Sequence, residues 1–204
     1  PALAAATAKL DTPFGVLSQA ALAHNAHDLL ARRTQSGGST TIRVASKSLR
    51  VRGAIEAVEA LAGYHGVLAY SLPEGLWLAK NILDVVVGYP SVDRAAIEQL
   101  GHDENLARRV TIMVDSVAQL DFFDTVIAPG KRSRIRVCLE LDASWDSKLL
   151  GHMGTWRSPV HSVAQARALA QHIVERPGFA LVGLMAYEGQ IAGTVDRPEG
   201  RPAY

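Results

Sequence analysis

The chain has 204 residues, of which 48% are hydrophobic and 20% charged, so it is expected to bury a core and to fold as one domain or a large part of one. Its 21 Lys and Arg residues balance 20 Asp and Glu residues, and the formal net charge of +1 argues against a dedicated nucleic-acid or membrane-surface binder. The single cysteine, Cys138, fits a reducing compartment, and no apolar run reaches the roughly 20 residues that cross a bilayer, so we expect a cytoplasmic protein with no nucleic-acid or membrane partner.

The first predicted element is an amphipathic helix that begins after Ser18, a residue type that caps helix N-termini. Its apolar side is formed by Leu22, Ala26, Leu29 and Leu30. The segment 36–40, which is rich in serine and glycine, connects this helix to the first strand.

Six short runs rich in valine, isoleucine and leucine follow along the chain. They predict strands over residues 41–46, 66–70, 83–88, 110–114, 135–141 and 180–186. Before the last of these strands, Ser162 predicts the start of a second amphipathic helix, which Pro177 and Gly178 end. The apolar face of that helix consists of Ala166, Leu169, Ala170, Ile173 and Val174.

The strands are almost continuously apolar, which is typical of a parallel sheet covered on both faces. They recur about every 28 residues, close to the roughly 31 residues per unit of an eight-unit barrel. A doubly wound open sheet also accommodates six strands, but the glycine fingerprint that usually follows its first strand is missing. The predicted fold class is therefore α/β, a parallel (β/α)8 TIM-barrel type with about six βα units in this chain.

In such a barrel, catalytic residues lie at the C-terminal ends of the strands. The residues at these ends are Lys47, Tyr70, Ser71, Tyr89, Asp115, Glu140, Asp142, Tyr187 and Glu188. A helix-capping role is an equally good interpretation for Ser71 and Asp115. Lys47 is more distinctive, because a buried ammonium is costly unless it is paired, deprotonated or covalently used. A desolvated lysine suits Schiff-base chemistry with an aldehyde, and a lysine paired with a neighbouring carboxylate fits the pattern equally well.

Several strands also resemble those of a known superfamily. Residues 42–48 resemble the first strand of the fold-type III pyridoxal-phosphate enzymes, the alanine racemase and D-threonine aldolase superfamily. Further stretches resemble successive strands of its amino-acid aldolase and deaminase branch, namely 66–71, 87–90, 113–116, 139–142 and 183–188. The resemblance implies that Lys47 holds pyridoxal phosphate as a Schiff base, that Arg157 lies near the phenolic oxygen of the cofactor, and that Tyr187 packs against its pyridine ring. The alternatives are a surface arginine and an ordinary barrel-mouth tyrosine.

Members of this superfamily continue with strands seven and eight, a glycine-rich phosphate-binding loop and a C-terminal β domain, which carries divalent-metal ligands in the aldolase branch. No segment of residues 1–204 has the spacing of those parts. We therefore interpret residues 1–204 as an incomplete alanine-racemase-like barrel, strands one to six, and expect any metal ligands of a full-length protein to lie outside this chain. The expected partner is a second copy in a homodimer, or another chain that completes the barrel.

For function, the resemblance implies a pyridoxal-phosphate enzyme that acts on an amino acid as its small-molecule substrate, and D-amino acids or β-hydroxy amino acids are expected. A lyase of the D-threonine aldolase or D-amino-acid dehydratase type is the first hypothesis, and an amino-acid racemase is the second. A non-catalytic pyridoxal-phosphate homeostasis protein is the third, because single-domain members of the superfamily lack the β domain.

Overall fold

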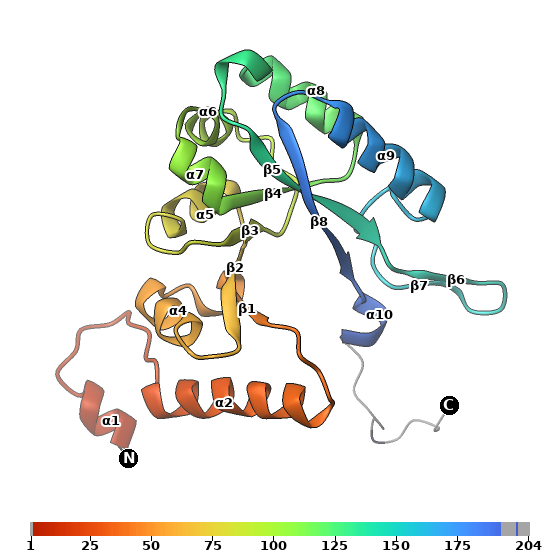
Figure 1. Cartoon of the computed structure of the whole chain (residues 1–204). Coiled ribbons are helices and arrows are strands. Elements are labelled where there is room, and N and C mark those ends of the chain that lie inside the picture. The colour runs from red at the N-terminus through yellow and green to blue at the C-terminus, as the bar shows by residue number, and fades with distance from the viewer. Residues whose placement is uncertain (1, 193–198, 200–204) are drawn as a thin grey trace.

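The computed structural model describes residues 2–192 and residue 199. Six parallel strands form one sheet in the order β1-β2-β3-β4-β5-β8 (Figure 1). Their bounds are β1 Ile42–Ala45, β2 Tyr64–Ala69, β3 Val85–Val87, β4 Val110–Val114, β5 Ile135–Asp142 and β8 Phe179–Tyr187. The spatial order follows the order along the chain, as in a barrel, whereas the order reverses in a doubly wound sheet. This confirms the predicted α/β fold of TIM-barrel type.

Helices alternate with the strands and cover the convex face of the sheet (Figure 1). The longer ones are α2 Gln19–Gln35, α4 Arg52–Glu59, α5 Leu72–Leu78, α6 Arg94–His102, α7 Glu104–Arg109, α8 Val117–Val126 and α9 Val163–Glu175. The short ones are α1 Ala2–Thr7, α3 Ser46–Leu49, the 3₁₀ turn Pro129–Lys131 and α10 Gly189–Ala192. Within residues 2–192 and 199, no helix has the length and apolar character needed to span a membrane.

Alternate residues of each strand point to opposite faces of the sheet. One set packs under the helices and forms the core, for example Val67, Val85, Ile112 and Val137. The expectation that both faces are covered holds for β4, where all five residues are buried. It is wrong for β8, where Val182 and Leu184 are exposed, because β8 is an edge strand of the described sheet.

Both predicted helix starts are confirmed. The Ser18 side chain accepts a hydrogen bond from the backbone N–H of Ala21, and Ser162 forms a capping box with Gln165. The predicted apolar faces are partly wrong, because Leu29 and Val174 are exposed. Each lies about a quarter turn away from a neighbour that packs against the core.

A two-stranded antiparallel hairpin projects from the body between β5 and α9 (Figure 1). It consists of β6 Trp145–Ser147 and β7 Gly151–Met153. No element is predicted from the sequence in this region, since three-residue strands are too short to show a period of two.

Candidate active site

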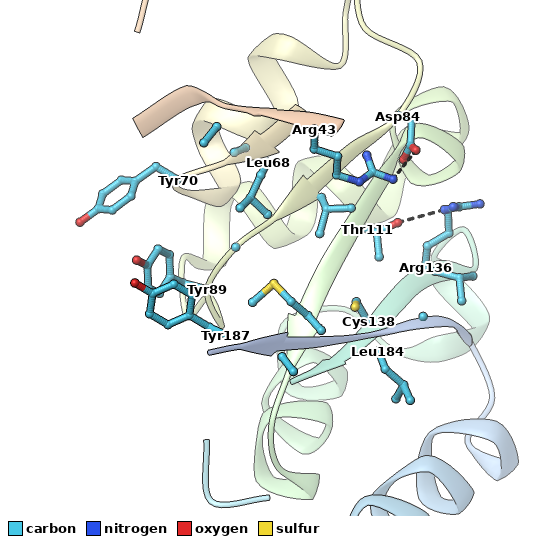
Figure 2. Close-up of a pocket in the computed structure, with 18 of the residues that line it drawn as sticks. Arg43, Leu68, Tyr70, Asp84, Tyr89, Thr111, Arg136, Cys138, Leu184 and Tyr187 are labelled. Atoms are coloured by element: carbon cyan, nitrogen blue, oxygen red, sulfur yellow. Dashed lines mark hydrogen bonds and ion pairs between the residues drawn. The ribbon is translucent and has the colours of Figure 1, made fainter. Parts of the chain in front are cut away.

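A cavity of about 590 Å³ lies over the concave face of the sheet (Figure 2). All six strands contribute to its wall, and its floor is mostly apolar, with Leu68, Val86 and Leu184 among the lining residues. Ligand sites in proteins have volumes of roughly 300–1,000 Å³ and are mostly apolar with a few polar groups. The cavity is therefore large enough for a cofactor-sized molecule.

Three tyrosines gather at the carboxyl end of the strands (Figure 2). Tyr70 follows β2, Tyr89 follows β3, and Tyr187 ends β8. The rings of Tyr70 and Tyr89 meet edge to face, with their centroids 5.5 Å apart. All three side chains are about half exposed, so their rings offer apolar surface to a flat molecule in the cavity.

Arg157 lies beside these tyrosines and lines the same cavity. Its guanidinium carbon is 4.5 Å from the ring centroid of Tyr89 and 5.6 Å from that of Tyr187. Its Nε donates to Glu140 Oε1 at 2.7 Å, and its Nη2 donates to the carbonyl oxygen of Gly88 at 2.8 Å. The side chain is only 16% exposed, so the alternative of a surface arginine in a loop is wrong.

Glu140, the partner of Arg157, is almost completely buried in β5. Burial raises the pKa of the Glu140 carboxyl, the positive charge and hydrogen bond of Arg157 oppose that rise, and the charges of Asp115 and Asp142 add to it. Its second oxygen, Oε2, has no hydrogen-bond partner among the described residues. The carboxylate therefore depends on Arg157 for its stabilisation.

Asp142, at the end of β5, helps to hold the backbone of the loop that carries Arg157. Its Oδ2 accepts a hydrogen bond from the backbone N–H of Arg157 at 3.1 Å. Burial alone would raise the pKa of Asp142, but hydrogen bonds from Ser144 and from the Arg157 backbone, with the charge of His161, hold it below its ordinary value. Asp142 is thus an anionic anchor for this loop.

Lys47 also lines the cavity, on the side of β1. It does not end the strand: β1 stops at Ala45, and Lys47 lies in the four-residue helix α3. The expectation that its ammonium is buried is wrong, because Lys47 is exposed at the edge of the described sheet, where β1 has no strand on its outer side. In the described part of the chain, no carboxylate lies within ion-pair distance of Lys47, so the paired-lysine alternative has no support.

The helix-capping role considered for Ser71 and Asp115 is not observed. Ser71 occupies the N-cap position of α5, but its side chain makes no capping bond. The N-cap of α8 is Ser116, so Asp115 is not the cap. Asp115 instead lies close enough to Glu140 to influence its pKa.

A second group of charges lies at the opposite end of the cavity (Figure 2). Arg43 pairs with Asp84 at 2.5 Å, and Arg136 Nε donates to Thr111 Oγ1 at 3.1 Å. Sequence reasoning missed these residues because it considered only the strand ends. The available signal was a charged side chain within each of two apolar runs, at 43 and 136.

The remaining reactive side chains lie off the cavity or are inert. Burial raises the pKa of Cys138 to about 11. The charge of Glu140 adds to this rise and the charge of Arg43 opposes it. The thiol is therefore protonated near neutral pH. His152 and His161 both contact Asp146 on the hairpin, and neither lines the cavity. Among residues 2–192 and 199, no group of three or more His, Cys, Asp or Glu side chains is arranged to hold a metal ion.

Three solved structures have a similar fold. D-threonine aldolase from Filomicrobium marinum has a TM-score of 0.64 and 20% identity, over 86% of this chain and 44% of that one. Alanine racemase from Oenococcus oeni has a TM-score of 0.54 and 17% identity, over 81% of this chain and 39% of that one. D-threo-3-hydroxyaspartate dehydratase from Delftia sp. HT23 has a TM-score of 0.56 and 22% identity, over 87% of this chain and 44% of that one.

At these identities the likeness shows the fold alone, and the chain spans less than half the length of each of the three proteins. No curated protein matches the sequence. Residues 17–200, which include all six parallel strands and the cavity, match the model of the alanine racemase N-terminal domain. The chain therefore belongs to the alanine racemase N-terminal domain family.

Proposed function

We propose that this chain binds pyridoxal phosphate through Lys47 and belongs to an enzyme that acts on an amino acid. The observation that carries the proposal is that Lys47, Arg157 and Tyr187, which come from three distant parts of the sequence, line the same cavity. The family is enzymatic and depends on pyridoxal phosphate, which supports the same conclusion.

The side chains around the cavity suit this cofactor chemically. Lys47 supplies a primary amine for an aldehyde, Arg157 supplies a planar cation for an anionic oxygen, and the tyrosines supply flat apolar surface for an aromatic ring. The volume of about 590 Å³ leaves room for the cofactor and a small substrate.

Each residue has a distinct task in this proposal. Lys47 would hold the cofactor through its Nζ, a primary amine of the kind that condenses with an aldehyde with release of one water molecule. Arg157, held in place by Glu140 and Gly88, directs its guanidinium at an anionic oxygen of the cofactor or of the substrate. Tyr187 packs against the bound ring. The cofactor itself supplies an electron sink for the electron pair released at the α-carbon of an amino acid.

For the reaction, we propose a lyase of the aldolase or dehydratase type that acts on a D-amino acid or a β-hydroxy amino acid. The support is the fold shared with D-threonine aldolase and D-threo-3-hydroxyaspartate dehydratase. Racemisation is the second candidate, because alanine racemase from Oenococcus oeni has the same fold. Non-catalytic cofactor binding is the third, and an assay of turnover with D-threonine, D-alanine and D-3-hydroxyaspartate separates the three.

The decisive experiment is covalent trapping on lysine. The purified protein is mixed with pyridoxal phosphate, reduced with borohydride, digested, and its modified lysines are identified by mass spectrometry. We expect the label on Lys47 and its loss in Lys47→Ala, whereas Lys80→Ala, which removes an exposed lysine beyond α5, keeps the label. Equal labelling of all lysines, or a Lys47→Ala variant that retains the visible absorbance band, would contradict the proposal.

We also propose that a second copy of the chain, or another chain, covers the open side of the sheet. Val182, Leu184 and Tyr187 leave apolar surface exposed along β8, and an uncovered sheet edge favours association. The expected result is a dimer or a larger complex in light scattering. A monomer at micromolar concentration would contradict it.

A further inference from the structure

The turn that carries Lys47 is tied to the neighbouring strand by a closed triangle of hydrogen bonds. Ser46 Oγ donates to Glu74 Oε2 at 2.8 Å. The backbone N–H of Tyr70 donates to the same Glu74 oxygen at 2.9 Å and to Ser46 Oγ at 3.1 Å. Ser46 is completely buried, so its hydroxyl depends on these partners.

A second link holds the other end of the turn. Arg50 ends α3 with φ at 47°, in the left-handed region that residues other than glycine adopt only occasionally. The backbone N–H of Arg50 donates to the carbonyl oxygen of Ser46 at 2.9 Å. The Arg50 Nε donates to the carbonyl oxygen of Lys47 at 3.3 Å. Its guanidinium carbon lies 5.2 Å from the ring centroid of Tyr70. The turn is thus linked to Tyr70 from both ends.

Leu49, at the end of α3, packs against the core, and the hydrogen bonds of Ser46 and Arg50 fix the backbone on either side of Lys47. An isolated helix of four residues is unstable by itself, since forming its first turn costs more than its hydrogen bonds return. The Lys47 side chain is exposed and makes no ion pair among the described residues. Its position at the cavity mouth therefore depends on the backbone of residues 46–50.

We propose that Ser46 and Glu74 are positioning residues, which hold Lys47 beside Tyr70 so that its amine reaches a ligand in the cavity. The inference rests on the proposed function of Lys47. Glu74 lies in the first turn of α5, so the triangle joins the segments that follow β1 and β2 at the carboxyl end of the sheet. An amine held in one position reacts faster with a bound aldehyde than an amine on a mobile turn, because less conformational entropy is lost on reaching the transition state.

The test compares the rate of borohydride trapping of pyridoxal phosphate on Lys47 in four variants. Ser46→Ala and Glu74→Ala each break the triangle, and we expect trapping to slow by about tenfold or more. Glu74→Gln keeps an oxygen that accepts both hydrogen bonds, so it should retain most of the rate. Ser48→Ala, which removes an exposed hydroxyl from the same turn, is the matched control and should behave like the wild type.

A second readout separates positioning from general stability. The share of the label on Lys47 relative to Lys9, Lys80, Lys131 and Lys148 should fall in Ser46→Ala at a temperature where circular dichroism shows a folded protein. If Ser46→Ala and Glu74→Ala trap the cofactor on Lys47 as fast as Ser48→Ala, the positioning role is refuted and the proposed function stands. If wild-type Lys47 takes no label, both are refuted.

Discussion

The guanidinium of Arg157 and the carboxylate of Glu140 form an ion pair at the carboxyl end of the sheet, with side-chain exposures of 16% and 1%. Such a pair contributes little net stability compared with apolar residues of the same shape, but removal of one partner leaves a buried charge without compensation. The pair therefore holds Arg157 in one place without adding net charge to the cavity.

Arg157→Lys keeps the positive charge, but it should still weaken the binding of pyridoxal phosphate. The guanidinium donates to Glu140 and to Gly88 at the same time, and the ammonium of lysine lacks this planar fork. We expect the dissociation constant to rise by about tenfold, equivalent to about 1.4 kcal/mol. An absorbance titration measures it, and an unchanged constant would show that Arg157 does not contact the cofactor.

Glu140→Gln should change how stability depends on pH. Because the pKa of Glu140 is raised in the folded state, the folded protein binds this proton more tightly than the unfolded chain. The contribution of Glu140 to stability is complete below its ordinary pKa of about 4.5 and is lost as pH rises through the folded value. The free energy of unfolding of the wild type, minus that of Glu140→Gln, should therefore fall from pH 4 upward in urea titrations. A flat difference would contradict this sign.

Cys138 should resist alkylation in the folded protein. Its thiol is buried and its pKa is raised to about 11, so little thiolate is present at pH 8. We expect no reaction with a thiol reagent such as Ellman's reagent over minutes in buffer and one thiol per chain in denaturant. Rapid reaction without denaturant would contradict the burial of this thiol, which lines the cavity.

Asp124 should be important for stability, although it lies far from the cavity. It pairs with the fully buried Arg132 side chain at 2.7 Å and with Arg176 at 2.7 Å, which joins α8 to the segments before β5 and before β8. Asp124→Ala should lower the free energy of unfolding by about 3 kcal/mol, because the fully buried Arg132 loses its ion-pair partner and Arg176 keeps only Asp121. Urea denaturation measures this loss.

The matched control is Arg108→Ala, which removes an exposed ion pair with Glu104 within α7. Exposed pairs of this kind contribute about 0.5 kcal/mol or less. Equal losses in Asp124→Ala and Arg108→Ala would contradict the importance of Asp124.

Local features of the sequence were enough to predict the six parallel strands and both capped helices. Each strand is a run of valine, isoleucine and leucine, and Ser18 and Ser162 mark helix starts through hydrogen bonds to residues three positions away. Local patterns of this kind do not need the rest of the fold. The same reasoning placed Lys47 and Tyr187 near one end of the sheet, whereas the choice of Arg157 and the roles of all three residues rest on the resemblance to the superfamily.

The contacts that shape the site are not local, and the sequence alone did not predict them. Arg43 and Asp84 are 41 positions apart, and Arg157 and Gly88 are 69 apart. The exposure of Lys47 depends on whether a strand lies beyond β1, which no property of residues 41–48 determines. Ser46 has no distinguishing mark in the sequence, and its importance becomes visible only when Glu74 is brought to it by the packing of α5.

Arg157 spans the sheet as well as lining the cavity. Gly88 follows β3 and Glu140 belongs to β5, so the two hydrogen bonds of the guanidinium join the carboxyl ends of two strands that lie on either side of β4. A ligand that draws the guanidinium toward itself must therefore weaken these two hydrogen bonds or bind without disturbing them. Ligand binding at Arg157 should therefore compete with the tether between these two strands.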